Sequence, residues 1–236
     1  MSSHSRIEWT QSSWNPVTGC TSVSEGCQHC YARRMATRLK GMGLRRYRNG
    51  FCVTIHRDLL AVPLKWRKPR LIFVNSMGDL FHEKVPISFI REVFGIIEAT
   101  PRHTYQLLTK RADRLLKLAD RLSWPVNLWV GVTVEMQQYI NRIELLRKVP
   151  AAIRFVSFEP LLGPLKSLSL SKIDWAIVGG ESGPHARPME ANWARNVRDV
   201  CVDSAVPFFF KQWGGTQRKK QNRYIDRRLW NQYPNR

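Results

Sequence analysis

Short apolar runs recur along the chain, and segments with helical periodicity lie between most of them. Each run is apolar almost throughout instead of alternating with polar residues, which is typical of strands buried on both faces. One more strand is expected near residues 7–14, ahead of these runs. The runs with this character are 71–77, 104–109, 128–134, 153–158, 175–180 and 207–213.

The segments between the runs place apolar residues three and four positions apart, as one face of a helix requires. Strands that alternate with helices in this way predict an α/β fold with a parallel sheet, either an open doubly wound sheet or a barrel. The four apolar sets are Ile87, Ile90, Val93, Phe94 and Ile97; Leu115, Leu118, Ala119 and Leu122; Tyr139, Ile140, Ile143 and Leu146; and Trp193, Val197 and Val200.

Polar or glycine residues follow each apolar run. A single polar residue at a strand end is common, but six successive strands that end in this way suggest a shared site. In (β/α) barrels the carboxyl ends of the strands meet at one mouth, where the chemistry lies. The residues concerned are Asn75, Ser76, Asp79, Thr109, Lys110, Thr133, Glu135, Ser157, Glu159, Gly179, Gly180, Glu181, Ser182, Lys211 and Gln212.

No repeat, low-complexity tract or linker interrupts the sequence, so one barrel domain is expected over residues 1–215. Residues 216–236 form a basic C-terminal extension. This extension is either an ordered arm that grips a substrate or a mobile tail. Ile225, Leu229 and Trp230 lie at spacings that indicate at least partial docking.

The 236 residues are 43% hydrophobic, which suffices for one substantial core. No apolar run approaches the roughly 20 residues that a membrane span needs. The segment "MSSHSRIEWTQSSW" lacks the apolar core of a secretory signal. We therefore expect a cytoplasmic protein without a membrane partner, in a compartment where thiols stay reduced.

The net charge of +20 is unevenly distributed. Residues 31–70 carry twelve Lys or Arg against Asp58, a net of +11, and residues 211–236 carry eight against Asp226, a net of +7. Aromatic residues are interleaved with both stretches, a mixture that suits a phosphate backbone and stacked bases. The alternatives are a solvated basic surface, an acidic lipid or an acidic partner protein. Nucleic acid is the preferred interpretation.

Three of the five cysteines, Cys20, Cys27 and Cys30, follow the first expected strand with the spacing C-x6-C-x2-C. The odd count and the reducing compartment disfavour a disulfide framework. A zinc site with His29 or His4 as the fourth ligand is one alternative. A [4Fe–4S] cluster with one open iron is the other, and it needs only three cysteines in one loop. Cys201 is expected in the core and Cys52 inside a strand.

The sequence resembles the phage Gp37/Gp68-type proteins (DUF5131-like), a family of uncharacterised function related to radical S-adenosylmethionine enzymes. The resemblance covers about residues 7 to 215 and implies a partial (β/α)6-type, TIM-like barrel. The first cysteine gap is longer than the C-x3-C-x2-C spacing that is commonest in radical enzymes. The motifs that carry the resemblance are "WNPVTGC", "GCQHCYARR", "FVNSMGDLFHE", "QLLTKR", "WVGVTVE", "FEPLLG", "WAIVGGESG" and "FFFKQWG".

The resemblance implies that Cys20, Cys27 and Cys30 bind a [4Fe–4S] cluster whose open iron chelates S-adenosylmethionine. An external electron donor would reduce the cluster, and cleavage of the sulfonium would yield a 5′-deoxyadenosyl radical. The remaining implied sites are Asn75, Ser76 and Asp79 for the methionyl end; Thr133 and Glu135 for the ribose or carboxylate; Gly179 and Gly180 for the adenine; and Lys110, Glu159, Glu181 and Lys211 for substrate binding or proton transfer.

The preferred hypothesis is therefore a radical enzyme that modifies or repairs a nucleic acid or nucleotide. The main alternative is a non-catalytic, zinc-stabilised nucleic-acid-binding protein, which explains the charge but not the polar strand ends. A basic barrel enzyme with phosphate chemistry and a structural metal is a third reading, and no P-loop or paired-carboxylate motif supports it.

Overall fold

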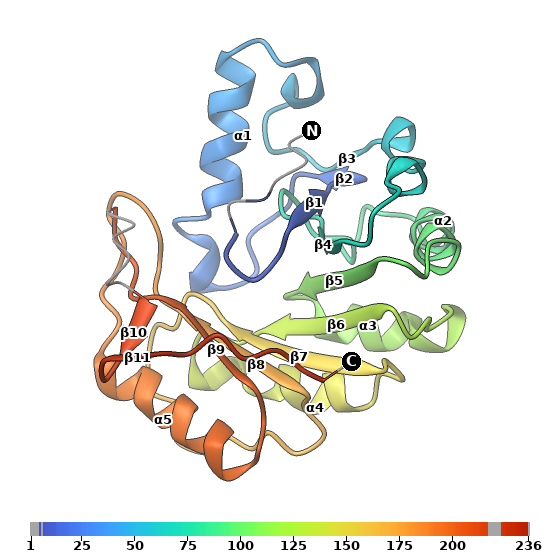
Figure 1. The fold of residues 1–236 in the computed structure, drawn as a ribbon. Helices are drawn as coiled ribbons and strands as arrows, with labels where there is room; N and C mark the ends of the chain where they lie inside the picture. The colour runs from blue at the N-terminus through green and yellow to red at the C-terminus, as the bar shows by residue number, and fades with distance from the viewer. Residues whose placement is uncertain (1–4, 6, 217–222, 236) are drawn as a thin grey trace.

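Seven parallel strands form one curved sheet, in the order β1-β4-β5-β6-β7-β8-β9. The computed structural model describes residues 5, 7–216 and 223–235. Figure 1 shows the sheet as an open half-barrel, which confirms the predicted partial TIM-like barrel. The strand bounds are β1 Ser12–Trp14, β4 Leu71–Val74, β5 Thr104–Thr109, β6 Leu128–Thr133, β7 Ile153–Phe158, β8 Trp175–Gly179 and β9 Phe208–Gln212.

Four helices pack against one face of the sheet, in the places that the apolar periodicity predicted. They are α2 Ile87–Glu98, α3 Ala112–Leu118, α4 Asn141–Arg147 and α5 Ala191–Asp203. A fifth helix, α1 Tyr31–Gly41, was not predicted. It stands apart from the other four, beside the amino-terminal edge of the sheet (Figure 1).

The two faces of the sheet bury different side chains. The outer face, with Ile72 and Val74 of β4, packs against the helices in the main hydrophobic core. The inner face forms a second, aromatic-rich core that includes Trp129, Phe155 and Trp175. Because both faces are covered, the strands read as continuous apolar runs in the sequence.

The C-terminal segment docks on the edge of the half-barrel. Phe210 N donates to Trp230 O (2.9 Å), and Gln232 N donates to Phe208 O (3.1 Å). Tyr233 stacks on Trp175, with ring centroids 5.2 Å apart. A hairpin of β10 Tyr224–Ile225 and β11 Arg228–Leu229 precedes this contact. Residues 217–222 of the predicted basic extension lie outside the described residues.

The two cysteines outside the triplet differ in their surroundings. Cys201 is buried in α5, as expected. Cys52 is exposed and precedes β3 Thr54–Ile55, which pairs with β2 Val17–Thr18, so its prediction as a strand-interior residue was wrong. No helix in the described part of the chain is long and apolar enough to span a membrane.

Candidate functional site

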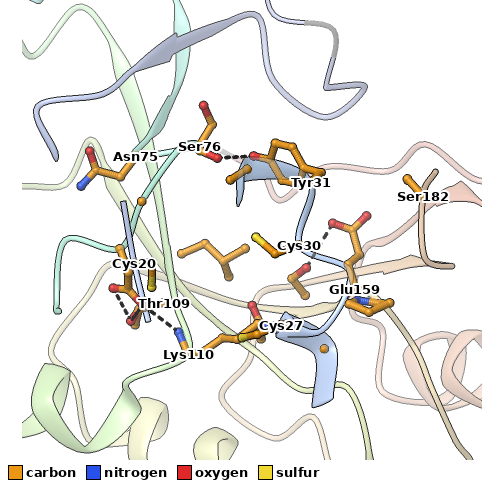
Figure 2. A pocket seen from close by; sticks show the side chains of 18 of the residues that line it. Cys20, Cys27, Cys30, Tyr31, Asn75, Ser76, Thr109, Lys110, Glu159 and Ser182 are labelled. Atoms are coloured by element: carbon orange, nitrogen blue, oxygen red, sulfur yellow. Dashed lines mark hydrogen bonds between the residues drawn. The ribbon is translucent and has the colours of Figure 1, made fainter. Parts of the chain in front are cut away.

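A cavity of about 240 Å³ lies at the carboxyl ends of the strands, where the predicted polar residues meet. Cys20, Cys27 and Cys30 line it together with residues from the strand ends, and Figure 2 shows the three cysteines among these residues. Trp9 and Phe73, from the inner aromatic core, also line it. The cavity therefore combines an apolar floor with a polar rim, as ligand sites usually do.

The loop that carries the three cysteines, residues 19–30, is called the cysteine loop. At two of its glycines the neighbouring chain lies so close that a side chain would not fit. A Cβ at Gly19, where φ is +84°, would lie 2.2 Å from Cys52 O. A Cβ at Gly26 would lie 2.6 Å from Glu135 Oε1. Glycine therefore lets the loop pack against the backbone before β3 at position 19 and against Glu135 at the barrel mouth at position 26.

Glu135 is a fully buried carboxylate that follows β6 and holds the middle of the cysteine loop. Arg142 Nη1 lies 2.7 Å from Glu135 Oε2, and Lys110 Nζ pairs with the other oxygen. The hydroxyl of Ser24 also donates to this second oxygen. Because Glu135 does not line the cavity, its carboxylate acts on the loop and not on a ligand.

Glu181 follows β8 and is held by Arg187. Arg187 donates to both carboxylate oxygens, at 2.6 and 3.0 Å, and also to the carbonyl of Glu25 at 3.0 Å. His29 Nδ1 lies 2.9 Å from Glu181 Oε2. Although burial opposes ionisation, hydrogen bonds from Arg187 and His29 lower the pKa of Glu181 to about 2. Glu181 therefore ties the C-x2-C segment to the barrel, through His29 directly and through Arg187 at Glu25 just before it.

Arg111 connects Asp79 to the first cysteine. Its Nη1 lies 3.2 Å from Asp79 Oδ2 and donates to Cys20 Sγ at 3.4 Å. The Asp79 carboxylate also accepts from Thr109 Oγ1 at 2.8 and 2.9 Å and from Phe81 N at 2.9 Å. Its acceptor sites are thus largely occupied by protein donors.

The thiols of the loop lie in different electrostatic environments. Burial and the Asp79 carboxylate raise the pKa of Cys20 to about 11, against the effect of Arg111. Burial also opposes ionisation of Cys27, but the Lys110 ammonium and hydrogen bonds from the backbone hold the pKa of Cys27 below its usual value.

Asn75 and Ser76 follow β4 and form another part of the cavity wall. Asn75 has φ of +60° and is buried; its Oδ1 accepts from Val17 N at 3.1 Å. Its Nδ2 has no hydrogen-bond partner among the described residues. The Ser76 carbonyl accepts from the hydroxyl of Tyr31, which joins this wall to α1 (Figure 2).

Glu159 and Lys211 form the remaining charged pair of the cavity. Lys211 Nζ lies 3.3 Å from Glu159 Oε1, yet that oxygen has no aligned hydrogen bond in the described chain. Ser157 Oγ donates to the other oxygen at 3.2 Å. Gly179 lies directly behind this carboxylate, since a Cβ there would be 2.8 Å from Glu159 Oε1.

The structure brings together most of the residues that the sequence suggested. Of the residues given a role, all but Glu135 and Gly179 line the cavity; of the other polar residues at strand ends, Thr109, Ser157 and Ser182 line it and Gln212 does not. Within the described residues, no group of three or more His, Cys, Asp or Glu side chains is arranged around a single metal ion. The suggested residues that line the cavity are Cys20, Cys27, Cys30, Asn75, Ser76, Asp79, Lys110, Thr133, Glu159, Gly180, Glu181 and Lys211.

Sequence reasoning missed the three arginines that pair with the buried carboxylates. Arg111 follows Lys110 directly in "TKR". Its position just after a predicted strand could have marked it as a residue of the site. Arg142 is the second residue of α4, seven residues after Glu135. Arg187 follows Glu181 by six residues in a loop, and no periodicity marks it.

A protein-family model described as "Protein of unknown function (DUF5131)" matches residues 4–234. No curated protein matches the sequence. Among solved structures, the chain is similar to a variant of spore photoproduct lyase at 14% identity, with a TM-score of 0.50, over 84% of this chain and 62% of that one. It also matches a variant with bound AdoMet and dinucleoside spore photoproduct at 14% identity, with a TM-score of 0.46, over 80% and 60% of the two chains.

At this identity the likeness shows a shared fold and no more. The chain spans 60 to 62% of the length of these two structures.

Proposed function

The chain belongs to the DUF5131 family, whose function is unknown, and we propose that it is a radical S-adenosylmethionine enzyme acting on a nucleic acid or nucleotide. The observation that carries the proposal is the meeting of Cys20, Cys27 and Cys30 in one cavity at the carboxyl ends of a parallel half-barrel. The fold shared with spore photoproduct lyase supports the barrel part of the proposal.

The three thiols fit a cluster in their number and surroundings. Each thiolate of a [4Fe–4S] cluster binds a different iron, so the three sulfurs need not converge on one point. Such a cluster carries negative charge, and cations lie beside two of the thiols: Arg111 at Cys20 and Lys110 near Cys27. With S-adenosylmethionine on the open iron, this group would supply hydrogen-atom abstraction from a substrate.

The methionyl end of the cofactor has a matching donor in Asn75. Its buried Nδ2 has no partner in the described chain. Because Figure 2 shows the amide turned away from Cys20 and Cys30, the side chain would have to rotate for Nδ2 to meet a carboxylate in the cavity. Ser76 and Thr133 supply further hydroxyls on the cavity wall. Gly180 also lines the cavity, but a Cβ there would lie 1.9 Å from Trp213 O, so its missing side chain allows close packing against the segment after β9.

The charged residues separate into two roles. Asp79, Glu135 and Glu181 are occupied by protein donors, so we assign them to positioning the cysteine loop, with Lys110 as the partner of Glu135. Glu159 and Lys211 both line the cavity, and among the described residues Glu159 is held only by Lys211 and Ser157. We assign proton transfer or substrate binding to this pair.

Anaerobic purification tests the cluster. We expect a brown protein with about four irons per chain, since three cysteines and one open iron hold a [4Fe–4S] cluster. Single Ala substitutions of Cys20, Cys27 and Cys30 should each abolish the iron signal. Cys52→Ala is the control, because Cys52 is exposed and does not line the cavity. A colourless protein that holds one zinc after reconstitution would refute the proposal.

Cleavage of S-adenosylmethionine is tested by a separate product assay. The reduced protein, incubated with S-adenosylmethionine, should release 5′-deoxyadenosine and methionine in equal amounts. Asn75→Ala should weaken S-adenosylmethionine binding while the iron content stays unchanged, because the residue contacts the cofactor and not the cluster. Iron loss in this variant would assign Asn75 a structural role.

A further inference from the structure

One face of α1 is exposed although it carries large apolar side chains. Tyr31, Met35 and Met42 are 46, 42 and 61% exposed. Arg34 and Arg38, both exposed, lie between them at helical spacings of three and four residues. We call these five residues the α1 face. Only Ala32 and Ala36 of the helix are buried, so the barrel covers the adjacent side and leaves this face open.

The α1 face begins at the candidate site. Tyr31 lines the cavity and its hydroxyl donates to the Ser76 carbonyl, after β4. Arg34 Nη2 donates to the Ser182 carbonyl, after β8, at 2.8 Å. The first turn of the helix therefore bridges two distant strand ends across the mouth. Figure 2 shows the Tyr31–Ser76 contact. A chain lying along the α1 face would lead directly into the cavity.

The charge around the face points to a polyanion. Residues 31–50 contain seven Lys or Arg and no acidic residue. In the described part of the chain, only Arg46 among these seven has an ion-pair partner, Asp58. The other six have no carboxylate partner there, although Arg33 and Arg34 each donate one hydrogen bond to an uncharged oxygen, so their charge is available to phosphates. Exposed rings or thioethers between them offer surfaces for unpaired bases.

The arrangement of the face disfavours an anionic membrane. A helix that lies in a membrane interface separates its apolar and cationic sides. Here Arg34 and Arg38 lie on the same face as Tyr31 and Met35, so burial of the apolar groups in lipid would also bury guanidinium groups. A single nucleic-acid strand presents phosphates and bases in alternation and matches this mixture.

We propose that the α1 face is a docking surface for a single-stranded segment of nucleic acid, which it guides toward the cavity. Arg34 and Arg38 bind backbone phosphates, while Tyr31 and Met35 contact unstacked bases. This inference rests on the proposed function, because it makes the substrate a polynucleotide and not a free nucleotide.

Fluorescence anisotropy of the full chain with a labelled strand of about 20 nucleotides, in DNA and RNA form, tests the proposal. The Arg34→Gln/Arg38→Gln variant should weaken binding roughly tenfold and make the plot of log K against log[salt] shallower by about 1.4, because each lost phosphate contact on a single strand contributes about 0.7. Lys117→Gln/Lys148→Gln is the control, since it removes the same charge from two exposed side chains of α3 and the end of α4. Its slope should stay near that of the unmodified protein.

A second variant separates base contacts from charge. Met35→Gln should weaken binding without changing the salt slope, because an apolar contact releases no counterions. Equal slopes for the α1 variant and its control would overturn the proposal, as would preferential binding to phosphatidylserine vesicles that the α1 variant abolishes. Iron content, measured on the same samples, reports the proposed function separately: a cluster-containing protein with unaltered slopes refutes only the docking surface.

Discussion

Glu135 offers a direct test of how the cysteine loop is held. Its carboxylate has no exposed surface and pairs with Lys110 and Arg142, whose side chains are 18 and 10% exposed. Glu135→Gln preserves shape but removes the charge. Two nearly buried cations would then lack a counter-charge, at a place where little water can compensate.

The size of the effect follows from this burial. Removal of one partner from a buried ion pair costs about 3–5 kcal/mol. The glutamine amide oxygen still accepts one hydrogen bond, and Lys110 borders the cavity, where water can reach its ammonium. We therefore expect a loss near the lower limit, about 3 kcal/mol of unfolding free energy. The control Glu144→Gln breaks a pair with Arg147 in which Glu144 is 58% exposed, and should cost about 0–1 kcal/mol.

Urea unfolding at pH 7 measures both variants, with all proteins in the same cofactor state. The midpoint should fall for Glu135→Gln, while an unchanged slope with denaturant would show that the denatured state is unaffected. A loss below about 1 kcal/mol, similar to that of Glu144→Gln, would refute the argument. It would mean that Lys110 and Arg142 find other partners or water once the carboxylate is gone.

Three further changes test other parts of the structure. Arg111→Lys should make the reduction potential of the proposed cluster more negative, because it removes the hydrogen bond to Cys20 Sγ; a redox titration followed by EPR that gives an unchanged potential would contradict this. Hydrogen bonds from two arginines of α5 lower the pKa of Asp226 from 3.8 to about 2, so its stabilising effect is present above pH 3.8 and is lost as the pH falls through about 2. The melting temperatures of Asp226→Asn and the unmodified protein should accordingly differ at pH 7 and converge below pH 2. Gly95→Ala, in an exposed turn of α2 with open space around it, should stabilise the fold by about 0.5–1 kcal/mol, whereas Gly180→Ala, whose Cβ would lie 1.9 Å from a backbone carbonyl, should destabilise it by about 1–3 kcal/mol. Thermal unfolding of the two variants should give shifts of opposite sign.

The sheet could be predicted because its strands are buried on both faces. Runs such as 128–134 and 175–180 lie within one or two residues of β6 and β8. The α1 helix escaped prediction for the opposite reason. It buries only Ala32 and Ala36, and its larger apolar side chains point to solvent, so no core-facing stripe marks it in the sequence.

The members of the site were predictable, but their partners were not. Strand ends in a parallel barrel converge whatever their side chains, so Asp79 and Glu181 could be grouped from the order of strands alone. Which cation meets which carboxylate depends on loop conformation. Arg187, for example, lies in a loop that reaches back to the carbonyl of Glu25, 162 positions earlier in the chain.

These partners give the long first cysteine gap a physical role. Three buried carboxylates follow β4, β6 and β8, and each acts on a different part of the loop: Asp79 through Arg111 on Cys20, Glu135 on Ser24, and Glu181 on His29. Ser24 lies within the six-residue gap. So does Glu25, whose carboxylate accepts from Gln138 at 3.0 Å and from the hydroxyl of Tyr139. The extra residues are therefore attachment points, and a loop shortened to three residues would lose the contacts that place Cys27 at the cavity.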